Sequence, residues 1–510
     1  MSRKEKGGLL TSILLGLFLR AFLLDTLEFK GDELEAILVG LNVPMQHWWI
    51  QHGMDSGIGV PNAPVFSYIM GLFTILSQDP LVLTLFFVII NCIVLLISPF
   101  FFAVFTRKRN HFLLCVFLFS LSPYLILYSR KIWAQNLLLF LVMPIVLLSI
   151  YVYRKPWLYL LIAILGSIVF QLHQTGILFV SFLVLFFLIS YRAFSDLENS
   201  MPLSNRLALS WSMLGIVLFL LTLLPYLHFL FFDFLDKNVV QKAGSASHKF
   251  YVSNALEWII WAATGNMFWT YHIPGLENTY TWPVLGLPGP ILALNLILTI
   301  PFIYGFFEYA KGAKLSLKRT PPFLSLYSSP LTFLIIAPSG FLLAAFLLLN
   351  IKIKTHPHYF TVILPFLIMI TANGTTKLFE YQGRFKKYLH VLICLGLISY
   401  CLQYPFFLSY LHWNNGSMGE YGVIYREQKR VARQIYDRFA GRRHIEICGI
   451  IPELDRRPDP SKLKDLEDTV RYICDQAFDK DLEFVKKKGQ GTKTLTLKNK
   501  DKILYLALEE

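Results

Sequence analysis

Two neighbouring carboxylates, Asp32 and Glu33, are the residues of this chain best suited to chemistry. They come soon after an apolar segment, residues 9–24, that carries its own arginine, Arg20. A positioned carboxylate can act as a general base, because it can take a proton from a hydroxyl group. Charged side chains beside a membrane segment are costly to place and commonly functional. The pair therefore indicates a reaction carried out at a membrane surface.

A purely structural role for Asp32 fits the same residues. Residues 32–41 can form a short helix that lies on the membrane, and Asp32 would then be its N-cap. Backbone N–H groups at the start of a helix stabilise an anion there. The sequence alone leaves both interpretations open.

Basic residues that could bind an anion occur in a tight turn and before a late apolar span. Arg130 and Lys131 lie in the turn at 128–133, and His356 and His358 flank a proline. Paired cations can hold a phosphate or a diphosphate. Snorkelling of Arg130 and Lys131 to lipid headgroups is the alternative. The two histidines are a weak metal signal, because no carboxylate spacing accompanies them, and phosphate hydrogen bonding suits them equally well.

Three further residues are candidates for contacts with a substrate: Asn62, His173 and Trp269. Asn62 lies just before a short apolar segment, 65–73, that fits a re-entrant or interfacial helix better than a membrane crossing. His173 occupies a turn between two apolar spans, where a single histidine is usually structural. Trp269 belongs to an aromatic-rich stretch, 233–287, whose rings could pack against sugars or isoprenoid chains, or form a belt at the membrane interface.

The composition of the chain indicates a membrane protein. Of its 510 residues, 55% are hydrophobic and 16% charged, whereas a soluble domain usually has about a quarter charged residues. Apolar runs long enough to cross a bilayer as helices occur at 8–24, 80–105, 111–128, 133–153, 157–172, 174–191, 207–232, 288–308, 327–350, 357–376 and 388–410. We therefore expect an all-α polytopic membrane protein with about eleven transmembrane helices in residues 1–410.

The distribution of basic residues predicts the orientation. Lys and Arg are much more frequent in the loops on the side of the N-terminus, which indicates a cytoplasmic N-terminus. The first loop, 25–79, and the large loop, 233–287, then face outward together with the turns at 129–132 and 351–356. The net charge of +14 is on this interpretation a topology signal, and we expect no nucleic-acid partner.

The tail, residues 411–510, differs from the rest of the chain by its high content of charged residues. An odd number of crossings places it outside the cytoplasm. We expect a small soluble α/β domain with helices at 423–440 and 461–478, a strand at 445–451 and a β-rich end at 493–508. Cys448 and Cys474 could form a disulfide there or remain reduced.

Four segments, taken in order, resemble the C-type (GT-C) glycosyltransferases, nearest the branch of protein O-mannosyltransferases and lipid A aminoarabinose transferases. The segments are Leu19-Arg20 with Gly31-Asp32-Glu33, Pro61-Asn62-Ala63-Pro64 with Ser77-Gln78-Asp79-Pro80, Leu121-Ser122-Pro123-Tyr124 with Ser129-Arg130-Lys131, and His358-Tyr359-Phe360 with Leu364-Pro365. Together they span about residues 8–376. Each motif is weak, and the likeness depends on their order and shared outward location.

The resemblance implies a GT-C-like catalytic domain at 1–410 that transfers a sugar from a polyprenyl-phosphate donor to a lipid, glycan or protein acceptor outside the cytoplasm. It implies that Asp32 is the catalytic carboxylate and that Glu33 supports it. Asn62-Ala63 stands where the family often has a basic residue or histidine. The expected donor-phosphate ligands are therefore Arg130, Lys131, His356, His358 and Tyr359. No cofactor is expected, a divalent metal is left open, and a bacterial inner membrane is the expected location.

Two other functions fit a polytopic chain. A transporter or flippase of lipid-linked sugars would have similar hydropathy, but it usually shows paired halves and charged or broken helices near the membrane midplane. An O-antigen ligase or polymerase would normally carry arginine and histidine in a large late outward loop, and the loop 233–287 contains no arginine. Both remain alternatives to sugar transfer.

Overall fold

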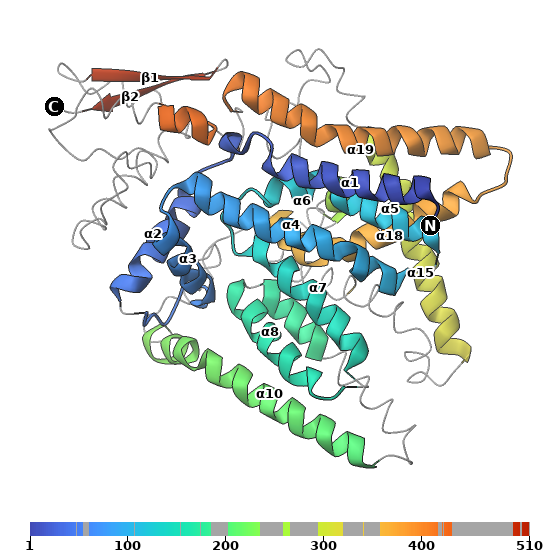
Figure 1. The fold of residues 1–510 in the computed structure, drawn as a ribbon, viewed down its shortest axis with the longest axis horizontal. Helices are drawn as coiled ribbons and strands as arrows, with labels where there is room; N and C mark the ends of the chain where they lie inside the picture. The colour runs from blue at the N-terminus through green and yellow to red at the C-terminus, as the bar shows by residue number, and fades with distance from the viewer. Residues whose placement is uncertain are drawn as a thin grey trace, which may run out of the picture.

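The fold is that of a mostly helical protein, seen in a computed structural model of the full chain (Figure 1). The structure describes residues 1–46, 48–54, 61–106, 108–152, 155–173, 175–184, 202–234, 259–265, 294–319, 340, 357–416, 421, 423–430, 493–499 and 502–508. The predicted elements at 445–451 and 461–478, Cys448 and Cys474 lie outside these residues.

The N-terminal half of the chain supplies most of the described helices. They are α1 (Arg3–Ala21), η1 (Leu24–Thr26), α2 (Gly31–Met45), α3 (Val65–Leu76), α4 (Pro80–Phe105), α5 (Arg109–Ser120), α6 (Pro123–Tyr128), α7 (Gln135–Tyr151), α8 (Leu158–Leu172) and α10 (Pro202–His228), with a π-helical turn, η2, at Phe229–Phe234.

The C-terminal half contributes fewer described elements. They are η4 (Leu294–Leu298), α15 (Thr299–Arg319), η5 (Pro357–Ile363), α18 (Leu364–Phe379), α19 (Lys386–Asn414), β1 (Lys493–Asn499) and β2 (Lys502–Leu508). β1 and β2 pair antiparallel with Lys493 opposite Leu508, so the β-rich end predicted at 493–508 is confirmed. That residues 411–510 form a separate domain stays a prediction.

Five helical stretches among the described residues are long and apolar enough to cross a membrane: Pro80–Phe105, Arg109–Tyr128 (α5 with α6), Ser210–Phe232, His358–Phe379 (η5 with α18) and Lys386–Trp413. They match five of the predicted spans. Shorter apolar helices occupy Gln135–Ser149, Leu158–Leu172 and Thr175–Val184, where three more were predicted. The apolar segment 65–73, for which we predicted a short helix, lies in helix α3 (Val65–Leu76). The total of about eleven crossings stays a prediction.

The predicted span 111–128 contains a break that positions the candidate site. The Ser122 hydroxyl accepts the Leu125 N–H at 3.3 Å, and Pro123 takes the first helical position of α6. A hydroxyl at the N-cap followed by proline is a typical helix start. The apolar run is therefore two helices, α5 and α6, and α6 ends at Tyr128, just before Arg130 and Lys131.

Arg20 joins the end of α1 to this break. Its side chain is buried, and Nη1 donates to the carbonyls of Gly16 at 2.8 Å and Ser120 at 3.0 Å. Ser120 is the last residue of α5. The arginine noted within the first apolar segment thus fixes α1 against the α5–α6 junction.

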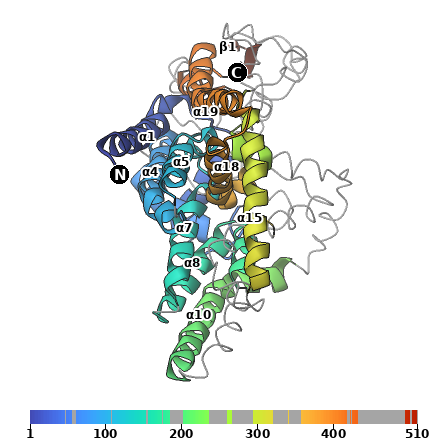
Figure 2. The ribbon, with the colours of Figure 1, turned by 90° about the vertical axis from the view of Figure 1, so that its right-hand side faces the viewer.

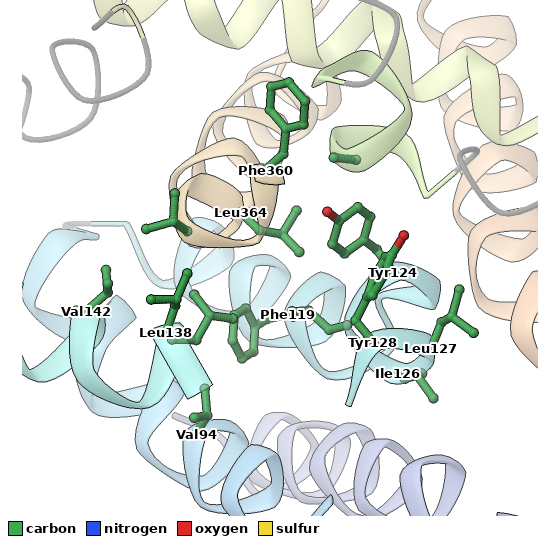
Figure 3. Packing of buried hydrophobic residues seen from close by; sticks show 14 of the residues in the cluster. Val94, Phe119, Tyr124, Ile126, Leu127, Tyr128, Leu138, Val142, Phe360 and Leu364 are labelled. Atoms are coloured by element: carbon green, nitrogen blue, oxygen red, sulfur yellow. The ribbon is translucent and has the colours of Figure 1, made fainter. Parts of the chain in front are cut away.

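The core lies between α4, α5, α6, α7 and the η5–α18 segment. In Figure 3, Leu364 from that segment points toward Tyr124 of α6, and Phe119, Leu138 and Val94 lie below it. α15 packs along α18 on another side of the molecule (Figure 2). This packing brings the start of the η5–α18 segment against the helices that flank the 129–133 turn.

Helices α2 and α3 pack closely against each other because a glycine of each helix lies at their contact. A Cβ on Gly40 would lie 2.8 Å from Cβ of Met70, and one on Gly71 would lie 3.0 Å from Cβ of Val43. Because α2 carries Asp32 and Glu33 in its first turn, this crossing fixes the direction of the helix that presents them.

We expect Gly40→Ala to destabilise the protein. Extra volume in a tight core costs about 1–3 kcal/mol, which exceeds the roughly 1 kcal/mol that alanine contributes to helix propensity. The measurement is the thermal unfolding midpoint in detergent. Gly8→Ala is the matched control, since its Cβ would meet nothing within 4 Å and should raise the midpoint slightly. A Gly40→Ala protein as stable as the Gly8→Ala protein would contradict the close crossing.

Candidate active site

The junction between α1 and α2 contains η1 and, from Thr26 to Phe29, a short buried run that includes Glu28. Leu27, Glu28 and Phe29 are all buried. The Glu28 carboxylate forms two ion pairs, one with Lys30 at 2.7 Å and a closer one with Lys131. Sequence analysis missed Glu28, although a charged residue between Leu27 and Phe29, four positions before Asp32, was a signal that could have identified it.

Lys131 projects from the turn after α6 into an aromatic surrounding. Its side chain is 2% exposed. Nζ lies 4.2 Å from the ring centroid of Trp133 and 5.6 Å from that of Tyr128. Cation–π contacts of this kind stabilise a desolvated ammonium. The Lys131 ammonium is thus buried against a carboxylate and aromatic rings, an arrangement that does not favour snorkelling to lipid headgroups.

Arg130 is also buried, and its terminal nitrogens bind protein groups. Nη1 donates to the Tyr404 hydroxyl at 2.6 Å, and Nη2 donates to the Leu23 carbonyl and, at 3.1 Å, to the Thr26 hydroxyl. Only Nε lacks a partner in the described part of the chain. The arginine thus ties the α1–α2 junction to α19.

Glu33 is buried on the inner side of the first turn of α2. Its Oε2 accepts the Lys30 N–H at 3.1 Å, and its Oε1 has no hydrogen-bond partner among the described residues. Burial raises the pKa of Glu33 to about 8, with Lys131 opposing the rise and the charges of Glu28 and Asp32 adding to it. Glu33 is therefore mostly a neutral acid at pH 7.

Asp32 presents the exposed carboxylate of the site. Helix α2 begins at Gly31 with Lys30 as its N-cap, so the interpretation of Asp32 as an N-cap is wrong. Its carboxylate makes no hydrogen bond with the described residues, and it interacts electrostatically with Glu33 and with the Tyr359 hydroxyl. Asp32 is thus a solvent-exposed carboxylate that interacts electrostatically with Tyr359.

Two histidines and two aromatic residues continue the site on the side of Lys131. The ring centroids of Trp133 and His358 are 4.6 Å apart, those of His358 and Tyr359 4.5 Å, and those of Tyr359 and His173 5.5 Å. Burial lowers the pKa of His173 to about 4, so its ring is neutral at physiological pH. Trp133 Nε1 is a buried donor that has no partner within the described segments.

The fold thus assembles seven of the predicted site residues around one locality: Asp32, Glu33, Arg130, Lys131, His173, His358 and Tyr359. The hydrogen bonds of Asn62 lie elsewhere, in the α2–α3 connection, where its Nδ2 donates to the Met54 carbonyl at 3.3 Å. His356 and Trp269 lie outside the described residues.

A cavity of about 410 Å³ opens between α3, α8 and α10. Its walls are mostly apolar, and its polar side is formed by Gln171, Ser167 and Thr222. Gln171 Nε2 donates to the hydroxyls of Ser167 at 3.0 Å and Thr222 at 3.2 Å. Gln171, the cavity residue nearest to the site in sequence, comes two positions before His173.

Comparisons with known proteins give a remote likeness among solved structures. No family model and no curated protein matches the chain. Among solved structures, the chain is similar to an oligosaccharyltransferase from Archaeoglobus fulgidus, solved in complex with zinc and sulfate, with a TM-score of 0.39 and 13% sequence identity. The similarity covers 89% of this chain and 58% of the archaeal chain, so this chain spans less than two thirds of that protein's length. A likeness this remote assigns neither a family nor an activity.

We expect Glu33→Gln to stabilise the protein in a pH-dependent way. The folded state binds the Glu33 proton more tightly than the unfolded chain, whose pKa is near 4.5, so ionisation up to about pH 8 costs the parent stability. The advantage of the variant should grow between about pH 5 and pH 8, reach at least ~1 kcal/mol, and level off above.

The measurement is the unfolding midpoint of parent and variant across this pH range. Glu380→Gln, at an exposed ion pair with Lys108, is the control and should show no such growth. If the stability of Glu33→Gln relative to the parent instead falls as pH rises, Glu33 is held ionised by Lys131.

We expect Lys131→Met to destabilise the protein more than the double variant Glu28→Gln/Lys131→Met. The single change leaves the buried Glu28 carboxylate with Lys30 alone, and breaking a buried pair typically costs about 3–5 kcal/mol. The double change removes both buried charges and should recover most of the loss. A double-mutant cycle on thermal unfolding measures the coupling. If the stability losses of Glu28→Gln and Lys131→Met add up in the double variant, the two charges do not interact.

Proposed function

We propose that the chain is a membrane glycosyltransferase that moves a sugar from a polyprenyl-phosphate donor to an acceptor hydroxyl on the extracytoplasmic side. The observation that carries the proposal is the exposed Asp32 carboxylate near the buried Lys131 and the half-buried His358 and Tyr359. A base and an anion-binding group, placed side by side, are the two elements that this transfer needs.

The charge balance of the site favours an anionic substrate. Three basic side chains, those of Lys30, Arg130 and Lys131, stand against the carboxylates of Glu28 and Asp32. Glu33 adds little negative charge, because burial raises its pKa to about 8. The remaining positive charge, in a poorly hydrated surrounding, stabilises a phosphate more than it would in water.

In the proposed reaction, Asp32 takes the proton of the acceptor hydroxyl while the acceptor oxygen bonds to the anomeric carbon. The bond between that carbon and the phosphate oxygen breaks, and polyprenyl phosphate leaves with the electron pair. Lys131 is the proposed counter-ion of the leaving phosphate, with His358, Tyr359 and the Trp133 N–H as hydrogen-bonding groups. His356, two positions before His358, is proposed for the same phosphate.

Two predicted residues have narrower proposed roles. Arg130 can approach the phosphate only through Nε, since its terminal nitrogens bind Tyr404, Leu23 and Thr26. Its proposed part is to hold the α1–α2 junction in place. Glu33, being buried and mostly neutral, is proposed to support the first turn of α2 and not to take the proton.

The isoprenoid chain has a proposed place in the cavity between α3, α8 and α10. Apolar walls suit an isoprenoid, and ligand cavities in proteins are usually apolar with a few polar groups. One lining residue of the cavity, Gln171, is two positions before His173, and the ring centroids of His173 and Tyr359 are 5.5 Å apart. A donor could thus place its chain in the cavity and its phosphate at the cluster.

We expect Asp32→Asn to reduce sugar transfer by roughly 100-fold or more while the protein folds normally, because the amide keeps the shape and loses the basicity. The measurement is transfer by purified protein from polyprenyl-phosphate donors carrying mannose or aminoarabinose. Asp25→Asn is the matched control, because Asp25 lies in the same junction and its carboxylate is 3.7 Å from Arg426. Transfer at the parental rate by Asp32→Asn would contradict the proposed base.

A further inference from the structure

The chain that follows α19 returns to the α1–α2 junction and pairs with its backbone. Ile424 forms an isolated antiparallel bridge with Glu28, and the Tyr425 N–H donates to the Leu27 carbonyl at 3.0 Å. We call Tyr421 together with residues 423–430 the post-α19 segment. Almost 400 positions of sequence separate the two paired runs.

Side chains of the post-α19 segment bind two more carbonyls of the same junction. The Tyr421 hydroxyl donates to the Thr26 carbonyl at 2.8 Å, and Gln428 Nε2 donates to the Phe29 carbonyl at 3.0 Å. Three carbonyls of a buried run, those of residues 26, 27 and 29, therefore find their donors in this segment. Buried backbone carbonyls without a partner are costly, so the junction depends on the segment for its conformation.

A second attachment holds the post-α19 segment to the start of α4. Lys429 Nζ lies 2.8 Å from Oδ2 of Asp79, and the Tyr425 hydroxyl donates to Oδ1 at 3.1 Å. Asp79 is the N-cap of α4, and its Oδ1 also accepts the Leu81 N–H at 2.8 Å. The segment is thus fixed at both ends, and it cannot shift without disturbing a helix cap.

From these contacts we infer that Tyr421 and Gln428 are positioning residues for the acidic junction. They fix the backbone of residues 26–29, and this backbone sets the Glu28 carboxylate against Lys131 and the start of α2 that carries Asp32. The inference rests on the proposed function for its catalytic consequence. It also means that the post-α19 segment binds the backbone that carries the Glu28 carboxylate and leads into α2.

The test compares Tyr421→Phe and Gln428→Met with Tyr400→Phe in the full-length protein in lipid nanodiscs. Tyr400→Phe is a matched control, because its buried hydroxyl donates to a backbone carbonyl, that of Leu118, at 2.9 Å, away from the junction. The first measurement is hydrogen–deuterium exchange of the backbone amides of residues 27–34. Exchange there should quicken about fivefold in the two test variants and stay at the parental rate in Tyr400→Phe.

The second measurement is sugar transfer. The two test variants should lose about tenfold in kcat with KM within about twofold, because a displaced carboxylate acts on the reacting state and not on donor binding. A merely structural loss would lower the amount of folded protein without changing kcat per folded molecule. Unchanged exchange at residues 27–34 in both variants overturns the inference. A parent protein that transfers no sugar overturns the proposed function alone, since the exchange result does not depend on it.

Discussion

The buried ion pair between Glu28 and Lys131 is the interaction on which the arrangement of the site depends. Each charge alone would be expensive to remove from water, and attraction between them repays this cost only when geometry and further contacts are good. Here Lys30 gives Glu28 a second cation, and the rings of Trp133 and Tyr128 surround the Lys131 ammonium. The pair therefore joins the α1–α2 junction to the turn after α6 at one point.

Three carboxylates within six positions have three different environments. Glu28 is buried and paired, Glu33 is buried with a pKa raised to about 8, and Asp32 is exposed. Carboxyl groups whose surroundings separate their protonation states can take separate roles in one site. Of the three, Asp32 is the carboxylate exposed to solvent.

Local sequence signals predicted the parts of this arrangement that are local. Asp32 and Glu33 lie in the first turn of a helix, as a Gly-Asp-Glu run before an apolar periodic segment suggests, and the short helix at 65–76 follows from the length of its apolar run. The break at Ser122 was present in the sequence as a serine before proline, but the continuous hydropathy of 111–128 concealed it.

Long-range pairing had no such signal. Nothing in the residues near Glu28 indicates that Lys131 would neutralise it, or that residues 421–428 would satisfy the carbonyls of 26–29. Extended runs without alternation carry little information about their partners, because register is set by side-chain burial that only the folded chain defines. The sequence therefore led to the carboxylates and cations of the site and missed the contacts that hold them.

The same contacts explain why Arg130 and Lys131, although adjacent in sequence, have different binding partners. Arg130 and Lys131 share a turn, but the planar guanidinium reaches two sides at once and bonds to Tyr404 of α19 as well as to the junction at Leu23 and Thr26. The compact Lys131 ammonium instead sits against a carboxylate and aromatic faces. The planar guanidinium of an arginine can make several hydrogen bonds in a fixed geometry, whereas the compact ammonium of a lysine is a point charge that can change partners. A phosphate entering the site would thus compete with Glu28 for Lys131, while Arg130 keeps the junction in place and Lys30 remains to hold Glu28.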